Sequence, residues 1–269
     1  MLEKPIITLT TDFGLKDPFV GLMKGVIMGI NPNATIIDIT HSVSRQNIFE
    51  AANVISLSYK YFPPTTIHVV VVDPGVGGLR RPILVVTEDY YFIGPDNGVF
   101  TPVFKKLQSH FFKVIHLSSS HYYLPMSGVT FHGRDIFAPI AAYLSKGTDY
   151  KNLGDQISDF TSIQIPSTDI KDGQSISGEI ISIDYFGNAI TNINREDLSK
   201  LAPLENNNKY KVSYNENQLS LAPYYAESKS SELSAIINSF GHLELFVYKE
   251  NAAEKHNIKI GDNVAVSLI

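Results

Sequence analysis

The first half of the chain alternates between strand-like and helix-like patterns of hydrophobic residues. Ile67–Val72 is an apolar run rich in valine, interrupted only by His68, which is typical of a strand buried on both faces. Apolar residues at helical spacing predict helices over Val20–Ile30, Ile48–Tyr61 and Ile136–Leu144. Shorter β-rich runs predict strands at Ile6–Thr10, Thr35–Ile39, Ile83–Thr87, Tyr90–Ile93 and Phe111–Leu117. This alternation indicates an α/β domain with a mostly parallel, helix-covered sheet.

The pattern changes after about residue 160, where polar turn residues gather. Beyond them the chain contains short β-rich runs and one short helical stretch at Ala252–His256. The strands are predicted at Ile176–Ile183, Ala189–Ile193, Tyr210–Tyr214, Leu243–Tyr248 and Val264–Ile269. Short strands separated by turns are typical of a small barrel or sandwich. We therefore predict two domains, residues 1–167 and residues 168–269.

Composition excludes several classes of partner. The chain of 269 residues carries a formal net charge of −5, and its only adjacent arginines are Arg80 and Arg81, so it lacks the basic surface that binds nucleic acid. Cysteine is absent, which excludes disulfides and thiolate metal sites. We find no signal peptide and no apolar run of the roughly 20 residues that span a membrane. We expect a cytoplasmic protein with no membrane partner.

Two aspartates directly follow predicted strands of the first domain. Asp12 lies in the sequence TTDFG, and Asp73 begins the glycine-rich sequence DPGVGGLRR. Ligands of open α/β sheets bind outside the carboxyl ends of the strands, where a carboxylate can accept hydrogen bonds from ribose hydroxyls. The alternative is that both aspartates only form turns and that Arg80 and Arg81 make solvated ion pairs.

Two further segments place polar side chains beside predicted elements. In the sequence FHGRD, His132 can orient a base or a water, whereas Asp135 is placed to cap the helix that follows. A lone histidine is also commonly structural. In the sequence DYFGN, an aromatic residue and an amide, Phe186 and Asn188, can stack on a purine and bond to its edge. The alternative there is an ordinary hairpin turn.

Known phosphate, dinucleotide and metal motifs do not fit this chain. The glycines after Asp73 are not followed by Gly-Lys-Ser/Thr, and they lack the dinucleotide spacing. Asp12-Phe13-Gly14 resembles a kinase motif whose other elements are missing. None of the eight histidines forms a His-x-His or His-Glu-x-x-His pair, and we predict no metal site.

Six motifs occur together along nearly the whole chain: TTDFG, DPGVGGLRR, PDNG, FHGRDIFAP, DYFGNAITNI and NSFGHLE. In this order they resemble the S-adenosyl-L-methionine (SAM) hydroxide adenosyltransferases, the adenosine-forming SAM hydrolases related to the SAM-dependent fluorinase and chlorinase. The resemblance implies an N-terminal α/β domain, a smaller C-terminal β-barrel and a homotrimer with ligand sites between subunits. It also implies hydrolysis of SAM to adenosine and methionine, with no metal and no cofactor.

The resemblance carries the family's functional residues onto matching positions of this chain. The catalytic set falls on Asp73, Arg80 and His132, and the ribose-binding aspartate falls on Asp12. Contacts to adenine and methionine fall on Asp17, Asp184, Phe186, Asn188, Ser239, Phe240, Glu244 and, through its backbone, Val247.

Two positions favour a hydrolase over a halogenase within this resemblance. Halogenases carry an aromatic residue where this chain has Asp73, and the fluorinase has a hydroxyl residue near its halide where this chain has Val76. A fixed carboxylate repels a halide and favours neutral water. The tryptophan of the halogenases is also missing, with Gln46 near its position. The alternatives are a chlorinase-like SAM:halide adenosyltransferase and a non-catalytic SAM or adenosine sensor.

Overall fold

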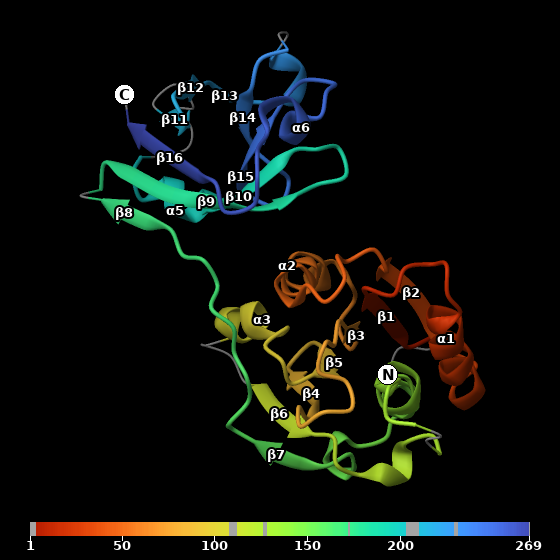
Figure 1. The fold of residues 1–269 in the computed structure, drawn as a ribbon. Coiled ribbons are helices and arrows are strands. Elements are labelled where there is room, and N and C mark those ends of the chain that lie inside the picture. Colours follow the sequence, from red (N-terminus) through yellow and green to blue (C-terminus); the bar gives the residue numbers. More distant parts are fainter. Residues whose placement is uncertain are drawn as a thin grey trace. The chain divides into compact units, whose positions relative to one another are not determined.

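The computed structural model describes residues 4–107, 112–125, 128–171, 173–202, 210–228 and 231–268, and the chain divides into two compact units at Ile165 and Pro166 (Figure 1). Phe111, the first residue of the strand predicted at Phe111–Leu117, lies outside the described residues. The N-terminal unit is an α/β fold and the C-terminal unit is built almost entirely from strands.

The N-terminal unit is built on a seven-stranded sheet in the order β2-β1-β3-β5-β4-β6-β7. The strands β2, β1, β3 and β5 are parallel, whereas β4, β6 and β7 join the sheet antiparallel. The prediction of a sheet with a parallel centre is confirmed. The strands are β1 (Ile6–Thr11), β2 (Thr35–Thr40), β3 (Ile67–Val71), β4 (Pro82–Thr87), β5 (Tyr91–Pro95), β6 (Phe112–His116) and β7 (Asp155–Ile157).

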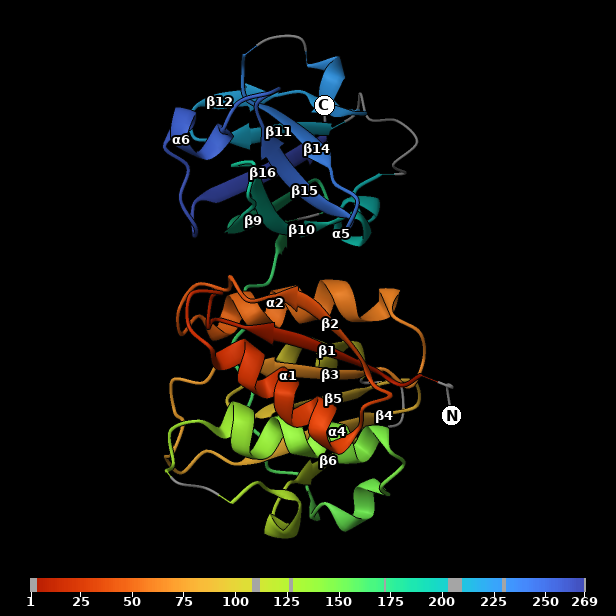
Figure 2. The ribbon, with the colours of Figure 1, turned by 90° about the vertical axis from the view of Figure 1, so that its right-hand side faces the viewer.

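Helices cover both faces of this sheet (Figure 2). Alternate residues of β3 enter different hydrophobic clusters: Val69 packs with residues of α1 (Phe19–Ile30) and α4 (Ala138–Ser145). Val70 packs on the other face with residues of α2 (Ile48–Ser58) and α3 (Thr101–Lys106). Because every side chain of β3 is buried, all of its residues except His68 are apolar.

Short helical turns supplement the regular elements of the N-terminal unit. A π-helical turn at Gly133–Phe137 leads directly into α4. Short 3₁₀ turns occur at Tyr59–Tyr61, Ser120–Tyr122 and Tyr150–Asn152.

The C-terminal unit is a nearly closed, barrel-like sheet around a large hydrophobic cluster. Its strand order is β12-β11-β16-β9-β10-β15-β14-β13, with β8 also paired to β9. The predicted β-barrel is confirmed. The elements are β8 (Asp169–Lys171), β9 (Ser175–Ile183), β10 (Ala189–Asn194), α5 (Arg195–Ser199), β11 (Tyr210–Tyr214), β12 (Asn217–Leu219), β13 (Leu221–Ala222), a 3₁₀ turn (Tyr225–Glu227), β14 (Ser234–Ile237), β15 (His242–Phe246), α6 (Ala252–His256) and β16 (Asn263–Leu268).

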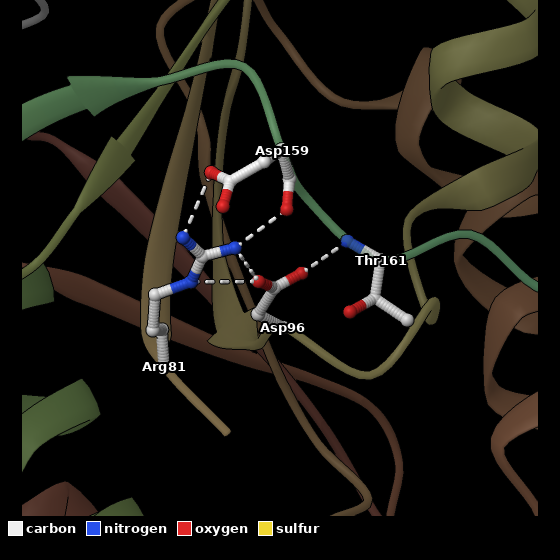
Figure 3. A network of polar contacts seen from close by, with 4 residues as sticks. All are labelled: Arg81, Asp96, Asp159 and Thr161. Atoms are coloured by element: carbon white, nitrogen blue, oxygen red, sulfur yellow. Dashed lines mark hydrogen bonds and ion pairs between the residues drawn. The ribbon is translucent and has the colours of Figure 1, made fainter. Parts of the chain in front are cut away.

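A polar network attaches the segment after β7 to the sheet of the N-terminal unit (Figure 3). Arg81 donates from Nε and Nη2 to one carboxylate oxygen of Asp96, at 3.1 and 2.8 Å. It also donates to the side chain and the carbonyl of Asp159, at 2.9 and 2.7 Å. The second oxygen of Asp96 accepts from the backbone N–H of Thr161 at 2.7 Å. Since Asp96 is buried, Arg81 forms a structural network in place of a solvated ion pair.

Candidate active site

The parallel centre of the sheet brings two of the predicted aspartates to one edge. In the register between β1 and β3, Thr11 pairs with Val71. Asp12 follows the first of these residues directly, and Asp73 lies two residues beyond the second. Both strands end at the same edge because they run parallel, so both carboxylates leave the sheet where open α/β folds bind ligands. Asp12 is held there by the backbone N–H of Gln46, which donates to its carboxylate at 2.8 Å.

The three predicted catalytic side chains are in contact with one another. Arg80 Nε donates to Asp73 Oδ1 at 3.0 Å, and Arg80 Nη2 contacts the second carboxylate oxygen, Asp73 Oδ2. The same Nη2 lies 2.7 Å from His132 Nδ1. The side chains of Arg80 and Asp73 are only 9% and 5% exposed, so this ion pair is buried. The contact between Arg80 and His132 joins two motifs that lie 52 residues apart.

Arg80 determines which nitrogen of His132 carries a proton. A guanidinium only donates, so His132 Nδ1 accepts and carries no proton. Burial and the positive charge of Arg80 both lower the pKa of His132 below its usual 6.5, and together they outweigh the opposing charges of Asp73 and Asp135. His132 is therefore neutral at neutral pH, with its proton on Nε2. Arg80 Nη1 is buried with no partner among the described residues, which leaves its two N–H groups unpaired.

Asp12, Asp73 and His132 line one cavity of about 680 Å³. Its wall also contains Arg134 and Asp135, which form an ion pair. Asp73 is neutralised by Arg80 and Asp135 by Arg134, whereas Asp12 has no cationic partner among the described residues. The cavity therefore carries one uncompensated negative charge, which favours a cationic ligand.

The segment after His132 differs from the prediction. Asp135 does not cap α4: it lies inside the π-helical turn, and its carboxylate accepts from Arg134 Nε and Nη2 at 2.6 and 3.0 Å. Arg134 also lies over the ring of Phe131, 5.1 Å from its centroid. The wrong prediction has a physical reason, since the π-turn begins helical structure before Asp135 and leaves this carboxylate free to pair with its neighbour.

A second cavity, of about 540 Å³, lies in the C-terminal unit. Asp184, Phe186, Asn188 and Val247 line it, as do six further residues: Tyr225, Phe246, Tyr248, Lys249, Glu250 and Asn251. The carboxylate of Asp184 accepts from two backbone N–H groups of its own turn and from Asn188 Nδ2 at 3.1 Å, so it fixes the orientation of the amide. Gly187 has φ +85°, and a Cβ there would lie 2.0 Å from an oxygen of Asn251, so the turn requires glycine.

Four of the predicted contact residues do not line either cavity. Asp17, Ser239 and Phe240 are exposed at the surfaces of their own units. Glu244 is 2% exposed, and its carboxylate oxygens accept from Tyr225 at 2.8 Å and from Asn238 at 3.0 Å. Burial, together with the nearby negative charge of Asp184, raises the pKa of Glu244 although these two donors oppose the rise. Glu244 therefore holds Tyr225 and Asn238 in place.

Several aromatic residues that line the two cavities were not predicted as site residues. The rings of Phe13, Phe19 and Phe131 meet edge to face, with centroids 5.3 to 5.9 Å apart, in the wall of the first cavity. Phe13 and Phe131 lie within recognised motifs, so the sequence contained a signal for them. Tyr225 and Tyr248 line the second cavity but lie outside every motif.

Neither a metal centre nor a membrane span is found in the described part of the chain. Within it, no group of three or more histidine or acidic side chains is arranged to hold a metal ion. No helix in the same residues has both the length and the apolar character to cross a bilayer.

Comparisons with known proteins agree with this fold and identify the family. The family models of the N-terminal and C-terminal domains of SAM hydroxide adenosyltransferases match residues 7–154 and 178–265, so the chain belongs to this family. It is 34% identical to an (R)-S-adenosyl-L-methionine hydrolase of Methanocaldococcus jannaschii over 97% of this chain and 95% of that protein. A fluorinase of Actinopolyspora mzabensis is 26% identical, with 98% of each chain covered.

The fold also has a close counterpart among solved structures. A conserved protein from Thermotoga maritima has a TM-score of 0.88 and 33% sequence identity. The similarity covers 97% of this chain and 99% of that one, so it extends through both units.

Proposed function

We propose that this protein hydrolyses SAM by attack of water at the ribose C5′ carbon, which releases adenosine and L-methionine. One observation carries the proposal: Asp73, Arg80 and His132, from two separate segments, are in contact beside a cavity with an uncompensated negative charge. The substrate is a sulfonium cation, which such a cavity favours.

The reaction needs little from the protein beyond positioning and electrostatics. The water oxygen forms a bond to C5′ while the C5′–S bond breaks, and its electron pair leaves with sulfur as a neutral thioether. No acid is needed for this leaving group, and no metal is needed to neutralise it. The attacking water loses one proton. Holding water in line with the C–S bond can supply about 7–11 kcal/mol of the barrier in favourable cases.

Each member of the proposed catalytic set has a distinct role. Each carboxylate oxygen of Asp73 is engaged by Arg80 but retains a second acceptor site, so Asp73 can orient the water and accept its proton. The buried Nη1 of Arg80 is a donor that can stabilise developing hydroxide character. His132 holds Arg80 through Nδ1 and fixes the geometry.

The two cavities suit different parts of the substrate. We assign the ribose to Asp12, which has an acceptor carboxylate at the edge of the first cavity. We assign adenine to the second cavity, where Phe186 offers a ring and Asn188 an oriented amide. Asp17 remains a predicted methionine contact, Ser239 and Phe240 remain predicted contacts to adenine or methionine, and Val247 remains a predicted backbone contact.

We further propose that the protein acts as a homotrimer without metal or cofactor and that it prefers the (R)-sulfonium epimer of SAM. The trimer is a prediction of the family resemblance, in which a neighbouring subunit completes each site. Tyr185 and Phe186, 99% and 75% exposed in this chain, are suited to an interface. The choice of epimer rests on relatives with 29–34% identity, which are (R)-S-adenosyl-L-methionine hydrolases. A cytoplasmic location remains a prediction that the cysteine-free composition favours.

Incubation of the purified protein with SAM in oxygen-18 water, without added metal, tests the reaction. We expect adenosine labelled at its 5′ oxygen and unlabelled methionine, with faster consumption of the (R)-epimer. Label in the methionine would place the attack elsewhere. Intact SAM that remains bound would favour the sensor, and 5′-chloro-5′-deoxyadenosine formed on addition of chloride would favour the halide transferase.

The variant Asp73→Ala tests the proposed role of the carboxylate. We expect loss of turnover, because the water loses its acceptor, while SAM binding is largely retained because Asp73 is only one of several residues in the cavity wall. Calorimetric titration with SAM, beside the same product analysis, separates the two effects. Normal turnover in this variant would refute the assignment.

A further inference from the structure

A chain of polar contacts runs behind the Asp12 loop and involves no residue assigned to the reaction. Lys24 Nζ donates to Asp38 Oδ2 at 2.6 Å, and the other oxygen of Asp38 lies 3.1 Å from His41 Nε2. His41 Nδ1 lies 2.8 Å from the hydroxyl of Thr11, the last residue of β1. The Asp38 carboxylate lies within ion-pair distance of His41 Nε2 without forming an aligned hydrogen bond, and its negative charge favours a proton on that nitrogen.

This series of polar contacts ends on the loop that carries Asp12. The hydroxyl of Thr11 accepts from the backbone N–H of Phe13 at 3.2 Å, and the carbonyl of His41 accepts from the N–H of Gly14 at 2.8 Å. The loop is therefore held on both sides of Asp12 by one histidine. The same segment, through the backbone of Gln46, also bonds the Asp12 carboxylate itself.

The arrangement has the order of a hydroxyl, a histidine and a carboxylate, as in a catalytic triad, but its burial argues against a nucleophile. Thr11 has no exposed surface, and His41 is 5% exposed. Neither residue lines the first cavity. Side chains that cannot meet the substrate act through the groups they hold, which here are the backbone on either side of Asp12.

We infer that His41, oriented by Asp38, is a positioning residue that fixes the Asp12 carboxylate for the 2′- and 3′-hydroxyls of the ribose. This inference rests on the proposed function, in which Asp12 binds those hydroxyls. Two carboxylate oxygens accept two neighbouring hydroxyls only when their direction is fixed. A shift of the loop by a fraction of an ångström weakens both hydrogen bonds to the ribose together.

The test compares two valine substitutions on the same strand. Thr11→Val removes the hydroxyl that contacts His41, whereas Thr8→Val removes a similar buried hydroxyl that lies 2.8 Å from His68 Nδ1. Thr8 and Thr11 are both fully buried in β1, so both variants lose a buried threonine–histidine contact. Only the first contact holds the Asp12 loop. Thr11→Ser keeps the hydroxyl and serves as the rescue.

The measurement is equilibrium binding of adenosine and of 2′,3′-dideoxyadenosine by calorimetry. We expect Thr11→Val to weaken adenosine binding about tenfold, the scale of one charge-assisted hydrogen bond, and to leave dideoxyadenosine binding unchanged. Thr8→Val and Thr11→Ser should bind both ligands as the unmodified protein does. Asp38→Ala, at a partly exposed position, should show the same loss limited to adenosine.

Several outcomes would overturn the inference. Equal weakening of both ligands in Thr11→Val would reduce His41 to a structural role, and so would equal effects of Thr11→Val and Thr8→Val. If the unmodified protein binds both ligands equally, Asp12 does not bind the ribose and the inference fails with that assignment. If the unmodified protein does not hydrolyse SAM, these binding results remain valid. Failure of the proposed reaction can therefore be distinguished from failure of this inference.

Discussion

Lowering the pH below neutrality should destabilise the N-terminal unit through His68, a fully buried histidine and the second residue of β3. Its Nδ1 lies 2.8 Å from the hydroxyl of Thr8, and its Nε2 has no partner among the described residues. The ring stacks on Phe92 with centroids 5.2 Å apart, and Tyr59, Phe62 and Tyr90 surround it. Burial among these aromatic residues lowers the pKa of His68 to about 3.

The size of the effect follows from the difference between the folded and unfolded pKa values. An unfolded histidine has a pKa of about 6.5, so between that pH and about 3 the unfolded chain binds one proton more than the folded chain. The free energy of unfolding therefore falls as the pH falls, by about 1.4 kcal/mol for each unit within this window. Between pH 7 and pH 5 the loss is about 2 kcal/mol. Above pH 7 His68 contributes no pH dependence.

The test compares the unmodified protein with the double variant Thr8→Val, His68→Leu, which removes both polar partners and leaves no buried hydroxyl unpaired. Hydrogen exchange of the β1 and β3 amides, corrected for intrinsic exchange rates, reports the stability of the N-terminal unit at pH 7 and pH 5. Other titrating groups contribute equally to both proteins. The unmodified protein should lose about 2 kcal/mol more than the variant. Identical pH dependence would refute the assignment of a neutral, buried His68.

Three further predictions concern other polar groups. The ratio kcat/KM should stay level from pH 8 to pH 6.5, because His132 has a lowered pKa and remains neutral; a fall centred near pH 7 in a pH–rate profile would contradict this. Glu244→Gln keeps only one acceptor oxygen for its two donors, Tyr225 and Asn238. Because Tyr225 lines the second cavity, calorimetry should show roughly tenfold weaker adenosine binding. Asp159→Ala should leave the thermal unfolding midpoint unchanged, because its carboxylate is exposed and Arg81 retains Asp96; a lower midpoint would show that the exposed contact matters.

The elements that the sequence predicted well are those whose pattern reports burial. Ile67–Val72 was predicted as a doubly buried strand, and β3 occupies Ile67–Val71 with every residue buried. The helix at Ala252–His256 also has the predicted bounds, although Ala252 is its one buried residue. Strand direction is a different property, because alternation of strands and helices does not report it. The strands predicted at Ile83–Thr87 and Tyr90–Ile93 lie too close in sequence for a parallel crossover, and β4 and β5 are antiparallel.

The candidate site was predictable where its residues share a local motif. Asp12 and Asp73 follow the strands β1 and β3, and the strand pattern predicted that position for each, but not that the two strands are parallel neighbours. The burial of Glu244 was not predictable, because its partner Tyr225 lies 19 residues away in a segment without a motif. The helix-capping role assigned to Asp135 failed for a similar reason, since a π-turn and an adjacent arginine decide the carboxylate's partner.

The contacts of His41 show what a motif leaves out. Three residues in this series of contacts have an ordinary sequence context: Thr11 ends a strand, Asp38 lies on an edge strand, and His41 follows that strand. Their joint effect arises because β1 and β2 run parallel and end together, which places the residue after β2 beside the end of β1. The same parallel register that gathers Asp12 and Asp73 at one edge therefore also supplies the groups that hold Asp12. The parallel register of the sheet therefore places both the proposed substrate contact, Asp12, and the residues that hold it. Substitutions in β2 are expected to affect the site for this reason.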